Sequence, residues 1–385
     1  MADLTAERLD VDGLLADPAT RIVVCCGAGG VGKTTTAAAL GLRAAEVHGR
    51  RTVVLTIDPA RRLAQSMGLS ELDNTPRQVK GIDGETGGEL HAMMLDMKRT
   101  FDEVVQQHTT PQRAAEIFAN PFYQAMSSTF AGTQEYMAME KLGQLRSTDE
   151  WDLIVVDTPP SRSALDFLDA PARLSRFLDG RMLRMLLAPA RTGGRSMFSL
   201  VTASFGLFSR TVQKVLGAQL LTDLSGFVAA LDSMFGGFRH RADETYRILQ
   251  DPQTAFLLVA APERDAVREA AYFAERLVAE RMPIAGLVLN RMHRSEIDAL
   301  PAEVTEAAAE ALSAEGDQQM TADALRVHAG LVRTMEREQR VAATFTDAFP
   351  AVPTVSVTAQ PADVHDVDGL RTIGEALSFS PAPTS

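Results

Sequence analysis

Gly27-Ala28-Gly29-Gly30-Val31-Gly32-Lys33-Thr34 is the stretch of sequence that decides the fold. It comes directly after an apolar run at residues 21–26 and precedes two further threonines and a series of alanines. The apolar run predicts a buried strand, and the residues that follow the stretch predict a helix. Glycines let backbone amides curl around a phosphate group, and the N-terminus of a helix adds positive potential. The order strand, phosphate-binding loop, helix is therefore predicted here.

The spacing G-x-x-x-x-G-K-[ST] predicts bound ATP with Mg²⁺. Lys33 is expected to reach the β- and γ-phosphates, and the hydroxyl of Thr34 is expected to ligate Mg²⁺. Thr35, one residue further on, is placed to contact the α-phosphate. The backbone amides expected around the phosphates belong to Gly27, Gly29, Gly30, Val31 and Gly32.

Two aspartates follow later strand candidates. Asp157 comes after the apolar run at residues 152–156 and is expected to hold Mg²⁺ through water molecules. Asp58 ends the run at residues 52–57 and is expected to orient the water that attacks the terminal phosphate. An aspartate at a strand end is by itself only a turn signal. Together with the glycine-rich loop, the two aspartates predict ATP hydrolysis.

Short apolar runs alternate with longer helical patterns along the chain. This alternation predicts an α/β fold of the P-loop NTPase type, with a mostly parallel sheet covered by helices on both faces. The strand candidates are residues 21–26, 52–57, 90–95, 152–156, 254–260, 284–289 and 353–357. Ligands of such sheets bind beyond the carboxyl ends of the strands, where the loop and both aspartates lie.

Two long stretches interrupt the alternation. Residues 98–146 have a mainly helical pattern, and residues 170–249 carry large apolar side chains at helical spacing. A further alanine-rich helical stretch at residues 303–340 is expected on the surface. The expected organisation is an N-terminal extension (1–20), an ATPase core (21–169 and 250–370), an inserted helical subdomain (170–249) and a C-terminal tail (371–385).

The composition and net charge of the chain exclude some classes of partner and location. The 385 residues carry a net charge of −12, which disfavours nucleic acid as a partner. The first twenty residues do not resemble a signal peptide, and no apolar run of about 18 residues could cross a membrane, so a cytoplasmic protein, at most peripheral to a membrane, is expected. Cys25 and Cys26 are neighbours on a strand candidate and should point to opposite faces, which makes them a poor disulfide or metal pair.

Taken together, these motifs resemble the ArsA family, which includes arsenite-pump ATPases and eukaryotic ATPases that deliver tail-anchored membrane proteins. More broadly, the chain is similar to the dimeric P-loop group of MinD, ParA and the nitrogenase iron protein. Asp58-Pro59-Ala60 resembles the family's switch I, and Asp157-Thr158-Pro159-Pro160-Ser161 resembles switch II. The resemblance runs from about residue 21 to residue 370. It implies a two-fold dimer that opens and closes as ATP is bound and hydrolysed.

Three further segments carry the resemblance. Ala131-Gly132-Thr133-Gln134-Glu135 is similar to the family's Pro-Gly-x-x-Glu segment. Leu289-Asn290-Arg291 resembles the segment that contacts adenine, which implies this role for Asn290. Gln360-Pro361-Ala362-Asp363-Val364 resembles the adenine-side loop, which implies that Pro361 and Asp363 flank the base.

One departure from the family concerns Ala28. The family carries at this position a lysine that reaches across the dimer to the partner's nucleotide. A cation supplied in this way is worth about 10³–10⁵ in rate, so its loss predicts slow hydrolysis by a homodimer unless an arginine such as Arg61 or Arg62 substitutes. A heterodimer with a paralogous ATPase subunit that keeps the lysine is therefore expected, and a homodimer is the alternative.

Two further departures concern metals and clients. The chain lacks the cysteines that bind arsenite and the C-x-x-C motif that holds zinc, so neither site is expected. The Met- and Phe-bearing segment at residues 182–238 could form a groove for an apolar client helix, because methionine suits adaptable binding surfaces. A core or dimer-contact role for this segment is the favoured interpretation.

The sequence thus predicts an ATPase that couples dimer opening and closing to a protein or membrane-associated client, in anion transport or membrane-protein targeting. A MinD/ParA-like positioning scaffold is one alternative, but the tail at residues 377–385 shows no amphipathic membrane helix. A nucleotide-binding structural partner of an active paralogue is the other. Ala28 favours this second alternative, whereas the intact Lys33, Asp58 and Asp157 argue against it.

Overall fold

The computed structural model describes residues 7–57, 62–69, 72–121, 123–124, 133–159, 240–241, 243–295, 297, 300–316 and 318–378. The chain divides into two compact units. The first comprises Met1–Met94, Thr148–Ala164 and Ile248–Ser385, and the second comprises Leu95–Ser147 and Leu165–Arg247. Most of the predicted subdomain at residues 170–249 lies outside the described residues, so the domain boundaries given above stay a prediction.

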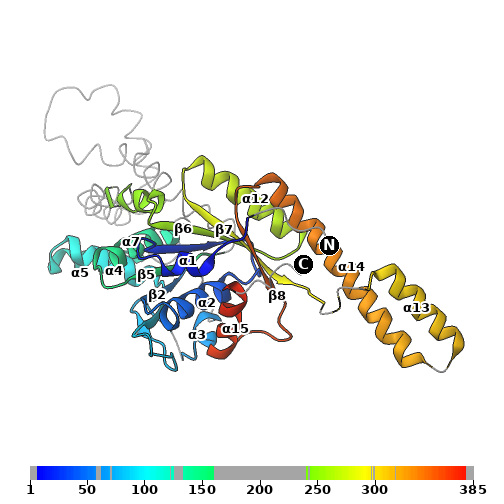
Figure 1. The fold of residues 1–385 in the computed structure, drawn as a ribbon. Helices are drawn as coiled ribbons and strands as arrows, with labels where there is room; N and C mark the ends of the chain where they lie inside the picture. Colours follow the sequence, from blue (N-terminus) through cyan, green and yellow to red (C-terminus); the bar gives the residue numbers. More distant parts are fainter. Residues whose placement is uncertain are drawn as a thin grey trace, which may run out of the picture. The chain divides into compact units, whose positions relative to one another are not determined.

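An eight-stranded sheet forms the centre of the first unit, with the strand order β3-β4-β2-β5-β1-β6-β7-β8 (Figure 1). Its strands are β1 (Ile22–Cys26), β2 (Arg51–Thr56), β3 (Arg77–Gln78), β4 (Glu89–Met94), β5 (Leu153–Asp157), β6 (Thr254–Ala260), β7 (Ile284–Met292) and β8 (Thr354–Thr358). β3 pairs antiparallel with β4, and the other neighbours in the sheet are parallel. The predicted α/β fold with a mostly parallel sheet is confirmed.

The apolar runs form strands because the sheet is buried on both faces. All five residues of β1 are buried, and so are all five of β5 and all seven of β6. Alternate residues of β1 serve different faces: Val23 and Cys25 belong to one hydrophobic core, which does not include Cys26. Both cysteines are free thiols, and burial raises the pKa of Cys26 to about 12. The thiol of Cys26 therefore stays protonated at neutral pH.

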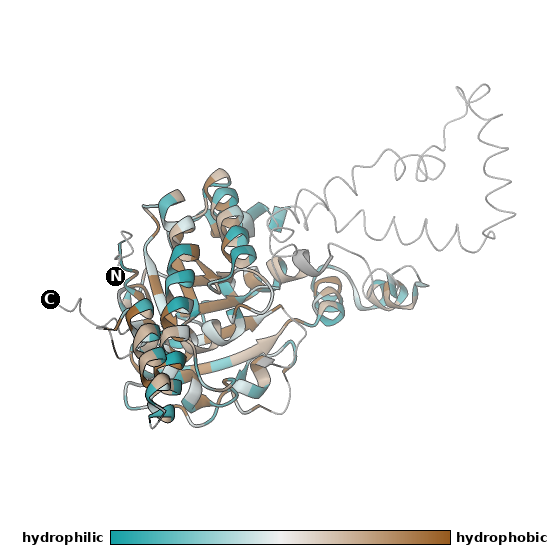
Figure 2. Cartoon of the chain, turned by 90° about the vertical axis from the view of Figure 1, so that its right-hand side faces the viewer, coloured by the Kyte–Doolittle hydropathy of each residue, from teal (hydrophilic) through white to brown (hydrophobic). Residues whose placement is uncertain are grey.

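Helices cover the sheet of the first unit on both sides. The described helices of this unit are α1 (Val11–Ala16), α2 (Lys33–Glu46), α3 (Arg62–Ser66), α12 (Arg264–Ala279), α13 (Ala302–Glu315), α14 (Gln319–Ala348) and α15 (Val367–Ser378). Among them, α13 packs mainly on α14 and not on the sheet. α2 and α15 lie on one side of the sheet and α12 on the other (Figure 1). Brown, hydrophobic strands run between helices whose outward surfaces are largely teal, or hydrophilic (Figure 2). A side chain at Gly41 of α2 would come within 2.5 Å of Val54 on β2, so this glycine permits close packing of helix and sheet.

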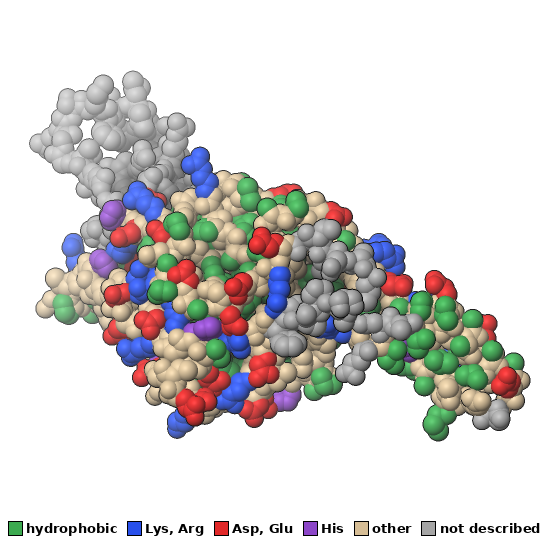
Figure 3. All heavy atoms as spheres, viewed as in Figure 1, with side chains coloured by type: hydrophobic (Ala, Val, Ile, Leu, Met, Phe, Trp, Pro, Cys, Tyr) green, Lys and Arg blue, Asp and Glu red, His purple; other side chains and the backbone are tan. Residues whose placement is uncertain are grey.

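The alanine-rich stretch expected at residues 303–340 is helical but forms two helices, α13 and α14. The break falls at Gly316, whose φ of +85° ends α13 in the left-handed conformation that glycine adopts readily. Hydrophobic side chains gather over this helical hairpin (Figure 3). Val304, Met320 and Val327 are among its exposed apolar residues.

In the second unit, the described part consists mainly of α4 (Met97–His108), α5 (Pro111–Ala119) and α7 (Thr133–Ser147), in agreement with the helical pattern at residues 98–146. Charged pairs connect its segments. Lys141 on α7 lies 3.2 Å from Glu103 on α4, and Arg241 lies 2.8 Å from the buried Glu140. No helix within the described ranges of either unit is long and apolar enough to span a bilayer.

Candidate functional site

The glycine-rich loop joins the carboxyl end of β1 to the start of α2, as predicted. Gly30 and Gly32 have φ angles of +78° and +95°, which L-amino acids with side chains rarely adopt. Gly27 is required by space, because a Cβ there would lie 2.1 Å from the carbonyl oxygen of Val259 on β6. Gly32 is the N-cap residue of α2 and provides no side-chain cap, so the first-turn amides of the helix face the loop's concavity. The loop has the backbone geometry of an anion-binding site.

Lys33 is the first residue of α2, and its side chain folds back over the loop. Its Nζ donates a hydrogen bond to the carbonyl oxygen of Ala28 at 2.7 Å, and the residue is only 7% exposed. Ala28 itself is buried and belongs to the hydrophobic core on this side of the sheet. The ammonium group is therefore held at the loop, and the position that carries a second lysine in the family contributes only a methyl group and its backbone.

Asp157 ends β5 between the ends of β1 and β2. The sheet register aligns it with Cys25 on β1 and with Thr56 on β2. Its Oδ2 accepts hydrogen bonds from Thr34 Oγ1 at 2.8 Å and from Thr56 Oγ1 at 2.9 Å. Asp157 is fully buried. The structure thus brings together Thr34 and Asp157, the two side chains predicted for Mg²⁺, and adds Thr56, which the sequence had not indicated.

These groups suit magnesium chemically. A carboxylate and a hydroxyl are hard oxygen donors, and Mg²⁺ in nucleotide sites uses one or two such protein ligands together with water and phosphate oxygens. The backbone next to Asp157 is also fixed, because Thr158 Oγ1 donates to the carbonyl oxygen of Cys25 at 2.8 Å. No group of three or more His, Cys, Asp or Glu side chains that could hold a metal ion occurs within the described ranges.

Asn290, near the end of β7, braces the loop. Its Nδ2 donates to the carbonyl oxygen of Val31 at 2.8 Å, and its Oδ1 accepts from the amide of Arg291 at 3.0 Å. A Cβ on Gly32 would lie 2.2 Å from the same Nδ2, so the brace requires glycine at this position. Arg291 has a φ of +62°, at the point where the pairing of β7 with β8 shifts register. The contact of Asn290 with adenine stays a prediction.

A cavity of about 560 Å³ lies beside the loop within the first unit. Lys33, Thr34 and Thr35 line it, and so do Asn290 and Asp363. Pro361 does not line it, although its neighbours Gln360 and Ala362 do. Arg291 also lines it, together with Gln65, Ser66, His293, Thr358 and His365, which no sequence motif had indicated. Some of the residues predicted for the phosphates and two of those predicted for the base, Asn290 and Asp363, thus border one cavity.

His293 connects this cavity to α14. Its backbone amide donates to Glu338 Oε2 at 2.9 Å, and its Nδ1 lies 2.6 Å from Glu338 Oε1. Glu338 is only 6% exposed. The buried carboxylate therefore holds the segment that follows β7, and with it one border of the cavity.

Several predicted site residues lie outside the described residues. They include Asp58 and Arg61, the segment with Ala131 and Gly132, Pro160 and Ser161, and all of residues 182–238. Their predicted roles therefore stay predictions. β2 is described as far as Ile57, whose amide donates to the carbonyl oxygen of Asp157 at 3.0 Å.

Residues 20–314 match the family model described as anion-transporting ATPase. ATPase GET3 from Malassezia globosa is 28% identical over 173 residues, which cover 45% of this chain and 49% of that protein. A putative arsenical pump-driving ATPase from Prosthecochloris vibrioformis is 31% identical over 162 residues, 40% of this chain and 36% of that protein. ATPase get3 from Schizosaccharomyces japonicus is 22% identical over 283 residues, 73% of this chain and 78% of that protein. The chain thus spans about half or less of the length of the first two relatives.

Proposed function

Because the chain belongs to the anion-transporting ATPase family, we propose that it binds ATP with Mg²⁺ in the cavity beside the loop and hydrolyses it. One observation carries the proposal: Lys33 and Thr34 border the same cavity as Asn290 and Asp363. A volume of about 560 Å³ is in the range of small-molecule sites. The groups proposed for the phosphates and for the base thus border one cavity whose volume suits a small molecule.

The loop and Lys33 would bind the phosphates. The amides of the loop and of the first turn of α2 provide several donors for one anionic group. The ammonium of Lys33, which now donates to Ala28, would exchange this carbonyl for phosphate oxygens. A charged acceptor makes a stronger hydrogen bond than a carbonyl, which favours this exchange.

Thr34 and Asp157 would hold Mg²⁺, with Thr56 fixing the carboxylate. The ion, when bound, offsets negative charge on the phosphate oxygens. Asp58 follows the described end of β2 and would orient the attacking water and accept its proton. A cation close to the terminal phosphate would then stabilise the charge that develops there.

Steady-state ATP hydrolysis and binding of a fluorescent ATP analogue test the proposal together. Lys33→Ala is expected to weaken analogue binding by about 10- to 100-fold, because charged hydrogen bonds to the phosphates are lost. Asp58→Asn is expected to bind ATP but not to turn it over. Lys80→Ala, at an exposed site, is the control and should behave as the wild type. Hydrolysis that survives in both active-site variants would contradict the proposal.

We further propose that the working unit is a dimer with a paralogue whose loop carries a lysine at the position of Ala28. The support is chemical: Ala28 is buried and offers no cation, and the ammonium group of Lys33 is held at its own loop by the carbonyl oxygen of Ala28. A partner lysine would complete the site of this chain. The alternative is a nucleotide-binding partner that does not hydrolyse ATP, and Ala28 supports it equally. Asp157, which accepts hydrogen bonds from two hydroxyl groups, favours hydrolysis instead.

The proposed role of hydrolysis is to couple opening and closing of the dimer to a protein or membrane-associated client at the cytoplasmic side. Family membership supports this coupling, and so does the position of Asp157 at the end of β5, in register with Thr56 at the end of β2. Anion transport and membrane-protein targeting remain the two candidate processes. Capture of a partner by the Asp58→Asn variant in the presence of ATP would distinguish them, because the ATP-bound state retains what it binds.

A further inference from the structure

A second cavity, of about 520 Å³, lies between α12 and α14. It shares no lining residue with the cavity beside the loop. The two helices lie beside each other (Figure 1). The lining residues are Arg264, Val267, Arg268 and Ala271 from α12, and Arg337, Arg340, Val341 and Thr344 from α14. Their spacing of three and four residues is that of a single helix face.

Four arginines thus border one groove, two from each helix. All four are exposed, whereas Val267 is buried and Ala271 and Val341 are half-buried. Aliphatic side chains therefore lie deeper than the guanidinium groups. The groove combines an apolar base with a positively charged rim.

The charge of this rim is poorly neutralised within the chain. The guanidinium groups of Arg264 and Arg337 make no hydrogen bond or ion pair with any described residue. Arg268 pairs with Asp265 at 2.9 Å, but both side chains are about four-fifths exposed, so water screens the pair. Arg340 donates to the backbone oxygen of Glu336 through Nε. In a chain with a net charge of −12, four arginines that share one groove indicate an acidic ligand.

We propose that this groove binds an acidic, amphipathic segment of a partner protein. Carboxylates of the segment would pair with the arginines on both helices, because guanidinium groups bind carboxylates in a bidentate manner. Aliphatic side chains of the same segment would pack on Val267, Ala271 and Val341. An extended groove between helices with an apolar base fits the helix-in-groove mode of peptide recognition. A small oxyanion would leave this base uncovered, which makes it the less suitable occupant.

The proposal is independent of nucleotide hydrolysis and can be tested on the full chain. The probe is a fluorescein-labelled peptide of Glu-Glu-Leu-Leu repeats, whose binding is followed by fluorescence anisotropy. The control peptide carries Gln in place of every Glu. Arg264→Gln combined with Arg337→Gln removes the two unpaired rim charges. The control is Arg326→Gln, at a half-buried arginine of the same α14 that does not line the groove.

The expected result is binding of the acidic peptide to the wild type and to Arg326→Gln, with about tenfold or greater weakening by the double substitution. Thermal unfolding should confirm that the double variant is folded, since both sites are exposed. Equal weakening by Arg326→Gln, or equal binding of the Gln peptide, would overturn the proposal. It would also be overturned if inorganic pyrophosphate or phosphatidylserine vesicles bound through these arginines while the peptide did not.

Discussion

At the scale of single residues, Gly32 and Asn290 depend on each other. Gly32 has a left-handed backbone conformation, and its missing side chain leaves room for the amide that donates to Val31. Asn290 lies on β7 and is separated by 259 residues from Val31, to which it donates this hydrogen bond. The shape of the loop therefore depends on a contact that local sequence does not encode.

Gly32→Ala is expected to destabilise the chain more than Gly81→Ala. Both glycines have positive φ angles, of +95° and +79°, so each alanine costs about 1–2 kcal/mol in backbone conformation. A Cβ on Gly81 meets nothing within 4 Å, whereas one on Gly32 displaces the Asn290 amide and adds about 1 kcal/mol for the lost hydrogen bond. Urea unfolding measures both values. Equal costs would contradict the proposed dependence, and Asn290→Ala should reduce the difference because the clashing amide is then absent.

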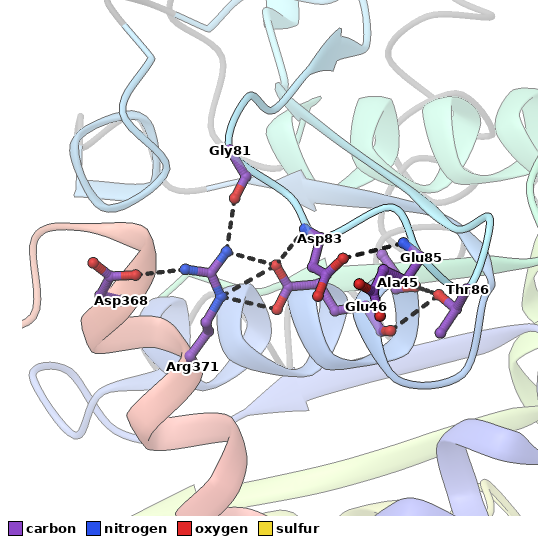
Figure 4. A network of polar contacts seen from close by, with 8 residues as sticks. All are labelled: Ala45, Glu46, Gly81, Asp83, Glu85, Thr86, Asp368 and Arg371. Atoms are coloured by element: carbon purple, nitrogen blue, oxygen red, sulfur yellow. Dashed lines mark hydrogen bonds and ion pairs between the residues drawn. The ribbon is translucent and has the colours of Figure 1, made fainter.

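At the scale of elements, α2 is held near its C-terminal end by charged contacts with two other helices, α1 and α15. Asp12 of α1 accepts from Arg43 Nε at 2.7 Å and Nη2 at 2.8 Å. Glu46, at the end of α2, accepts from Arg371 of α15, which also donates to the carbonyl oxygen of Gly81 at 2.7 Å (Figure 4). These contacts fix the helix whose N-terminus forms the site.

Arg371→Met is expected to lower the free energy of unfolding by about 1–2 kcal/mol, because Glu46 would keep a largely buried carboxylate without its charged donor. The expected loss is smaller than for a fully buried pair because the side chain of Arg371 is partly exposed to water. Arg268→Met, which breaks an exposed pair with Asp265 on α12, is the control and should cost about 0.5 kcal/mol or less. Urea unfolding of both variants provides the measurement. Equal losses of unfolding free energy in the two variants would show that the contact between α2 and α15 stabilises the fold no more than an exposed ion pair does.

The pairing of Asp12 with Arg43 predicts a dependence of stability on pH. The hydrogen bond from Arg43 lowers the pKa of Asp12 below its ordinary value of 3.8. A carboxylate whose pKa is lowered by folding stabilises the folded state above the unfolded pKa, and this contribution is lost as the pH falls through the folded pKa. The stability difference between wild type and Asp12→Asn should therefore be constant near neutral pH and vanish below 3.8. Urea unfolding across this range measures it, and a difference that persists in acid would contradict the assignment.

At the scale of the whole molecule, the sheet was predictable because its strands are buried on both faces. The seven predicted strands all occur, shifted at their ends by a few residues at most. β3 was missed because it consists of two polar residues, Arg77 and Gln78, and depends on its neighbour β4. The separation of α13 from α14 was missed because the alanine-rich helical pattern continues on both sides of the break. Gly316, which ends α13, is the residue that could have indicated it.

The site was predictable to the extent that its chemistry is local. The loop motif predicted that Lys33 and Thr34 belong to the site, and the position of Asp157 at the end of an apolar strand predicted the same for this residue. The contacts of Asn290 with the loop and of Glu338 with His293 join distant segments, and periodicity contains no information about such pairs. For the same reason, the arginine groove between α12 and α14 emerges only from the packed helices.

The most direct test of the account is the rate of ATP hydrolysis by this chain alone and after mixing with a paralogue that carries the loop lysine, with light scattering to record the assembly. The account predicts slow hydrolysis alone and a rise of about 10³–10⁵ in the mixed dimer, the range for a cation supplied by a partner. The rise should disappear when the paralogue's lysine is replaced by alanine. A homodimer of this chain that hydrolyses ATP as fast as the mixed dimer would contradict the account.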